Sequence, residues 1–171
     1  MRPVDARTVE ATWKEMCCAS RRDAERWIEE MSAEQPVVLA YLLAVDHDFL
    51  NQDEREQLLY LGVAVWRMMC RGGCRPATVT EELLDWVERR HEKELKRLVG
   101  KGPEVLERAA RDLLVRFPQP ELLRYVVEAL MEEEEEEGYA VRPEAKGLMV
   151  TRLLTVIEAL DSSAPSQGAG D

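Results

Sequence analysis

Four cysteines are the residues in this chain best suited to bind a metal ion. They form an adjacent pair, Cys17 and Cys18, and a pair separated by three residues, Cys70 and Cys74. Four thiolates hold Zn²⁺ in many structural sites, and these four would do so if the first helix packed beside the loop after Gly72. However, adjacent cysteines on a helix point about 100° apart, and Cys-x-x-Cys spacing is missing. We keep a metal site as an alternative, and interpret Cys17 and Cys70 first as small buried residues with reduced thiols.

Only two histidines are present. His47 lies between Asp46 and Asp48, a cluster that would hold a metal or act as a base but has no obvious further ligands. His91 completes Glu88-x-x-His91, which is half of the ligand set of a di-iron bundle, and the second Glu-x-x-His is missing. Because His91 also falls within an apolar stripe, we expect a buried imidazole that is hydrogen-bonded to a neighbour.

The sequence lacks the motifs of the familiar catalytic designs. It contains no Gly-x-Ser-x-Gly elbow, no Walker loop and no dinucleotide-binding glycine pattern. Its serines lie at expected helix caps or in the C-terminal tail. We therefore expect a binding protein rather than an enzyme, and no cofactor.

The formal net charge of −11 is distributed unevenly. Residues 86–116 carry nine Lys/Arg against six Asp/Glu, a net +3, whereas residues 117–171 carry four against twelve, a net −8. An acidic chain repels phosphate backbones and anionic membrane surfaces, and it favours a basic partner. We expect the densest acidic segment to form the partner-binding strip: Glu132, Glu133, Glu134, Glu135, Glu136 and Glu137.

A basic face is predicted on the helix over residues 80–99. Its outer positions hold Arg89, Arg90, Lys93, Lys96 and Arg97. A nucleic-acid-binding regulator is therefore a third hypothesis. Glutamates interleave with these cations at a spacing that favours pairing along the helix, so a solvated face is the favoured interpretation.

Helical periodicity dominates the chain, and strand alternation is nearly absent. Capping boxes at Ser32, Asn51 and Thr78 predict three helix starts. Two segments, Val37–Val45 and Leu58–Met69, are apolar on nearly all sides and should form the core. The predicted fold class is all-α, with six to eight helices in a compact bundle or short helical stack.

The first helix is expected to begin after Asp5, a plausible N-cap. Val9, Trp13, Met16 and Cys17 follow at spacings of 4, 3 and 1. These spacings place the four side chains on one face of a helix, which we expect to be its buried face.

One internal similarity bears on the architecture. Residues 35–43 and 119–127 both begin with Gln-Pro and repeat Leu and Tyr at a constant offset of 84. Each match precedes an apolar helix. The pattern predicts a three-helix unit used twice, over residues 20–71 and 103–161, joined by the helix over 80–99. Chance recurrence is the other explanation, because helix capping favours Pro at such a position.

Residues 1–161 are expected to form a single domain, and residues 162–171 a disordered tail. The N-terminal residues turn polar without the apolar region of a signal peptide. The longest apolar run, Pro36–Val45, is too short to span a bilayer. We therefore predict a cytoplasmic protein with no membrane partner.

The first functional hypothesis is a non-enzymatic protein-interaction or scaffold module that binds a basic protein or a second copy of itself. A metal-binding protein or metal-dependent enzyme, using the cysteines or His47, is the alternative.

Overall fold

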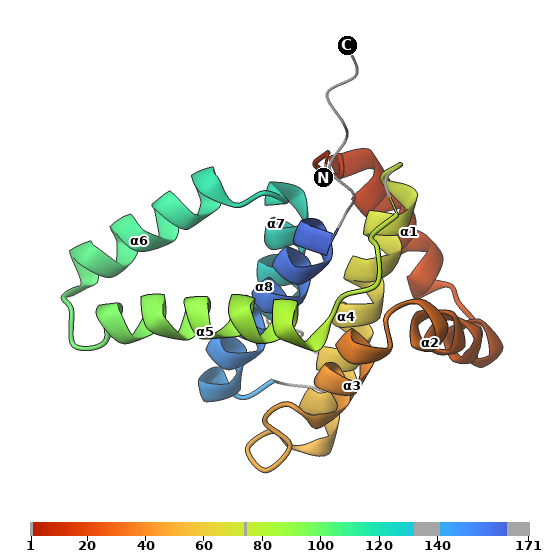
Figure 1. Ribbon diagram of the computed structural model, residues 1–171, viewed down its shortest axis with the longest axis horizontal. Coiled ribbons are helices and arrows are strands. Elements are labelled where there is room, and N and C mark those ends of the chain that lie inside the picture. The colour runs from red at the N-terminus through yellow and green to blue at the C-terminus, as the bar shows by residue number, and fades with distance from the viewer. Residues whose placement is uncertain (1, 74, 132–140, 164–171) are drawn as a thin grey trace.

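The computed structural model describes residues 2–73, 75–131 and 141–163, and these residues form eight α-helices and no strand (Figure 1). The all-α prediction is confirmed. Within these ranges, no helix combines the length and the apolar character needed to cross a lipid bilayer. The helices are α1 (Ala6–Cys17), α2 (Arg21–Glu34), α3 (Pro36–Ala44), α4 (Gln52–Arg71), α5 (Glu81–Leu98), α6 (Pro103–Arg116), α7 (Pro120–Met131) and α8 (Pro143–Ser163).

Side-chain caps fix the beginning of several helices and confirm some predicted starts. Asp5 caps α1 by accepting a hydrogen bond from the backbone N–H of Thr8. Asn51 forms a complete capping box with Glu54 at the start of α4. The predicted box at Ser32 is wrong, because Ser32 lies inside the last turn of α2 and its backbone belongs to that helix.

The α2 helix begins after Ser20, which forms a capping box with Asp23. Two predicted boundaries shift by a few residues. The start predicted at Thr78 moves to Thr80, whose hydroxyl caps α5. Residues 162–163, predicted to belong to the disordered tail, are helical because they form the last turn of α8.

The α4 and α8 helices form the centre of the molecule. They pack against each other, and both contact α7. The α4 helix buries most side chains from Leu58 to Met69, and α8 buries nine. The prediction that Val37–Val45 helps to form the core is confirmed by the buried Val38, Leu39 and Leu42, but the segment does not lie at the centre. The α3 helix covers one side of α4, so it buries three side chains and leaves Leu43 54% exposed.

Two buried glutamines connect segments that are far apart in the sequence. Gln35 precedes α3, and its Oε1 accepts a hydrogen bond from Val79 N at 2.9 Å. Gln119 precedes α7, and its Oε1 accepts from Val4 N at 2.9 Å. Gln119 Nε2 also donates to Asp161 Oδ1 at 2.7 Å. Each glutamine therefore fixes the backbone just before another helix, α5 in one case and α1 in the other.

Gln35 and Gln119, which begin the two matching segments, thus play equivalent roles, and this suggests different bounds for the predicted internal repeat. The α1 helix packs on α4, and α5 packs on α8. On this correspondence the repeated unit would contain four helices, α1–α4 and α5–α8, and α5 would be the counterpart of α1 rather than a linker. The duplication itself stays a prediction.

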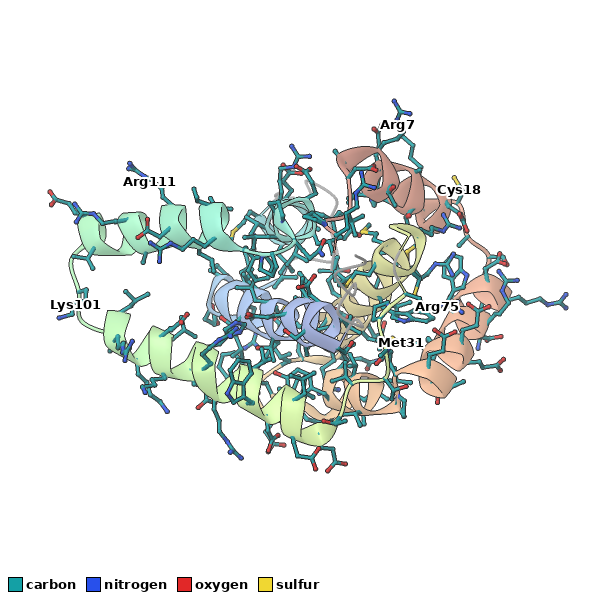
Figure 2. All side chains as sticks on the ribbon, turned by 45° about the horizontal axis from the view of Figure 1, so that its top comes forward. Arg7, Cys18, Met31, Arg75, Lys101 and Arg111 are labelled. Carbon is teal, nitrogen blue, oxygen red and sulfur yellow. The ribbon has the colours of Figure 1, made fainter. Side chains whose placement is uncertain are left out.

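The end of α5 and the whole of α6 project from the body as a helical hairpin (Figure 1). We call residues 92–116 the arm. Lys101 lies at its tip, as Figure 2 shows. None of the α6 side chains that the structure describes is buried. By contrast, α2 packs Trp27 and Met31 into the body.

Candidate functional site

A groove of about 460 Å³ lies between α1 and α7. Its apolar lining includes Ala6 and Val9 from α1, and Tyr125 and Ala129 from α7. The small side chains of the two alanines leave room between the helices. A groove of this size, with apolar and polar walls, is large enough to receive a few side chains of a partner.

Trp13 gives the groove a large aromatic surface. Its side chain lines the groove and is 44% exposed. Tyr125 is more deeply placed, and its burial raises the pKa of the phenol. Partly exposed aromatic side chains beside a groove are typical anchors of protein interfaces, and their ring faces attract cations.

The charged lining of the groove is net negative. Three carboxylates, those of Glu10, Glu121 and Glu128, line the groove together with one guanidinium, that of Arg124. Glu10 also pairs with Lys14, outside the lining, at 2.6 Å. Glu121 pairs with Arg124, and Glu128 Oε1 lies 3.9 Å from Arg124 Nε. Ion pairs this exposed contribute little stability, so their carboxylates can exchange partners for the cations of a ligand.

The sequence did not predict this groove. Trp13 and Cys17 were expected on the buried face of α1, but both are exposed, so that interpretation is wrong. The buried face of α1 instead holds Val9, Thr12 and Met16. Thr12 tolerates burial because its hydroxyl donates to the Thr8 carbonyl at 2.8 Å, an arrangement that a hydropathy pattern does not register.

The described cysteines have different surroundings. Cys17 lies beside Tyr60, and Cys70 lies beside Arg75, where burial raises the pKa of its thiol. Cys18 is exposed, and Cys74 lies outside the described residues. Over the part of the chain that the structure describes, no three His, Cys, Asp or Glu side chains gather as a metal site. The four-cysteine site stays an untested alternative.

His91 is buried, as the sequence predicted, and it connects α5 to α8. Its Nε2 lies 2.6 Å from Glu158 Oε2, and its Nδ1 lies 3.0 Å from Thr155 Oγ1. A hydroxyl, an imidazole and a carboxylate in series are the parts of a nucleophilic triad. Thr155, however, is fully buried and its hydroxyl also donates to the Thr151 carbonyl. No substrate can reach this hydroxyl, so the network serves to hold α5 against α8.

A second polar network surrounds Arg152 of α8. Arg152 donates to Asp46 Oδ2 at 2.6 Å and to Glu88 Oε1 at 2.7 Å. The Tyr41 hydroxyl donates to the same Glu88 oxygen. His47 is exposed and its ring lies 3.8 Å from Asp48. The predicted Asp-His-Asp cluster is thus divided, because Asp46 is engaged by Arg152.

The predicted basic face is solvent-exposed over most of its length. Lys93 and Arg97 are exposed, Arg89 pairs with Asp85, and Lys96 lies 3.4 Å from Glu92. Arg90 differs, because it pairs with Glu158 and stacks on Trp86. Four of these five cations therefore remain accessible, and Arg90 is part of the α5–α8 contact.

The predicted strip Glu132–Glu137 lies outside the described residues. In the sequence it follows Met131, the last residue of α7 and hence of the helix that forms one wall of the groove. Comparison with protein-family models, with curated proteins and with solved structures found no match to this chain.

Proposed function

We propose that the protein is a non-enzymatic interaction module that binds a basic protein segment in the groove between α1 and α7. The observation that carries this proposal is the combination of an exposed Trp13 with the carboxylates of Glu10, Glu121 and Glu128 in one groove. An apolar side chain of the ligand would occupy the groove, and its Lys or Arg side chains would meet the carboxylates and the indole face.

The charge of the whole chain favours the same class of ligand. A net charge of −11 attracts a basic segment and speeds its association. The Glu132–Glu137 run, which continues the sequence of α7, would add to this attraction. The polar networks around His91 and Arg152 are internal and offer no comparable access for a ligand.

The test uses a synthetic helical peptide that combines Lys and Leu side chains. Its fluorescence anisotropy is measured with the full chain, with Trp13→Ala and with Trp86→Ala. Trp86 is a matched control because it is an exposed tryptophan on α5, away from the groove. We expect Trp13→Ala to weaken binding about thirtyfold, or about 2 kcal/mol, and Trp86→Ala to leave it unchanged.

A second pair of variants tests the charge. Glu128→Gln removes a groove carboxylate, and Glu29→Gln removes an exposed carboxylate of α2. Only Glu128→Gln should weaken the basic peptide, and a peptide with Glu in place of Lys should not bind. Equal losses in the Trp13 and Trp86 variants, or no binding by the parent protein, would overturn the proposal.

A further inference from the structure

We propose that the basic segment bound in the groove is the tip of the arm of a second copy of this chain, residues 96–101. The inference rests on the proposed function, since it identifies the ligand of the same groove. The tip reads Lys-Arg-Leu-Val-Gly-Lys, with three cations and no carboxylate. Val99, at its apex, is 78% exposed.

The two surfaces are complementary in charge and in apolar content. The tip offers Lys96, Arg97 and Lys101, and the groove offers the carboxylates of Glu10, Glu121 and Glu128. Val99 supplies an apolar side chain for the space beside Trp13. Both surfaces are exposed in a single copy, so docking would bury the apolar side chains of both at once.

The charge distribution also favours this contact over others between copies. The arm, residues 92–116, carries seven Lys/Arg and five Asp/Glu, a net +2 within a chain of net −11, so the remaining residues are net −13. Two copies therefore repel one another over most of their surfaces, and the arm is where a second acidic body is attracted.

A copy cannot fill its own groove with its own arm. The tip of the arm and the helix α1 lie on opposite sides of the molecule, separated by α7, α8 and α4 (Figure 1). Since the two contacting surfaces differ, a single contact is head-to-tail: one copy keeps a free tip and the other a free groove for further copies.

The test is a charge-swap experiment on the full chain, followed by sedimentation velocity. The tip variant carries Lys96→Glu, Arg97→Glu and Lys101→Glu. The groove variant carries Glu10→Lys, Glu121→Lys and Glu128→Lys. In a mixture, the acidic tip of the tip variant can bind the basic groove of the groove variant. The basic tip of the groove variant can likewise bind the acidic groove of the tip variant. The control variant, Arg21→Glu with Arg22→Glu and Arg26→Glu, has the same charge change as the tip variant on exposed residues of α2.

We expect the parent and the control to associate as concentration rises, more weakly at about 1 M than at about 0.15 M salt. Each swap variant alone should be monomeric, with a parent-like circular dichroism spectrum, and their mixture should recover the parent's association. A parent that stays monomeric, swap variants that still associate, or a mixture that stays monomeric would overturn the second copy as ligand. Binding of the Lys/Leu peptide, measured separately, would then still support the proposed function, and its loss would overturn that as well.

Discussion

Glu54 is the one buried carboxylate in the part of the chain that the structure describes. Arg142 approaches it with two nitrogens, Nε at 2.8 Å and Nη2 at 2.7 Å, and the backbone N–H of Asn51 donates to it at 3.0 Å. The hydrogen bond from Arg142 lowers the pKa of Glu54 from 4.5 to about 2. The pair joins the start of α4 to the residue before α8, and so aligns the two central helices.

Glu54→Gln should destabilise the fold by about 2 kcal/mol at neutral pH, because it replaces the charge-assisted hydrogen bonds between the buried carboxylate and the partly exposed Arg142 with neutral ones. Since the folded-state pKa is depressed, the contribution of Glu54 is complete above about pH 4.5 and is lost as the pH falls toward about 2. In urea unfolding, the difference in free energy of unfolding between the parent and the variant should therefore shrink as the pH falls through this range. Glu144→Gln, on an exposed carboxylate 4.0 Å from Arg142, is the control. A difference in unfolding free energy that stays the same at every pH would contradict the stabilising role given to the Glu54 carboxylate.

At the scale of elements, the contact between α3 and α4 depends on a glycine inside a helix. A Cβ atom placed on Gly62 would overlap the Leu42 side chain, which is itself buried. Gly147 of α8 is also helical, but a Cβ atom there would meet nothing within 4 Å. The same substitution therefore has opposite consequences in the two central helices.

Gly62→Ala should destabilise the fold by roughly 1–3 kcal/mol, because the added methyl group forces α3 away from α4. Gly147→Ala should stabilise it by about 0.5–1 kcal/mol, since alanine has the higher helix propensity and the position is open. Thermal unfolding of the two variants measures both effects. An increase in the melting temperature of both variants would show that helix propensity alone governs these positions, and a decrease in both would contradict the stabilisation expected at Gly147.

The helices were largely predictable because each one is encoded locally. Pro at helix starts, caps such as Asp5 and Asn51, and apolar periodicity all act within a few residues. The position of α3 was not predictable in the same way. An apolar segment such as Val37–Val45 is compatible with any number of packed neighbours, and the number is decided by helices distant in the sequence. Ser32 failed as a cap because the α2 helix, already started at Ser20, continues through it.

At the scale of the whole molecule, the arm differs from the rest of the fold in how few of its described side chains are buried. The α6 helix has no buried side chain among those described, whereas its neighbours α7 and α8 contribute to the core. Local opening of a segment requires little free energy when few apolar contacts are lost. We therefore expect the arm to open locally more easily than the rest of the described chain.

Hydrogen exchange should show this difference directly. We expect the amides of α6 to exchange faster than those of α2, which has the same number of residues but anchors Trp27 and Met31 in the body. Mass-spectrometric exchange on the parent protein at low concentration measures both helices in one experiment. Equal protection of α6 and α2 would contradict the description of the arm as weakly anchored.

The candidate groove could not be predicted from the sequence, because it forms only when helices far apart in the chain pack together. Its two walls, α1 and α7, are separated in the sequence by five helices. Nothing in the local pattern of Glu10 and Trp13 indicates that Glu121 and Glu128 will lie opposite them. The proposal of a basic ligand, by contrast, needs only composition, because net charge does not depend on how the chain folds.

The hydrogen bond from Val4 to Gln119 also sets an order of events during translation. Gln119 follows Val4 by 115 residues, so the ribosome needs roughly 6–23 s to add it at about 5–20 residues per second. Until then the backbone N–H at the start of α1 has no acceptor from Gln119. The backbone before α1 therefore gains this hydrogen bond only after the five helices between α1 and α7 have been made, although α1 also packs on the earlier helix α4.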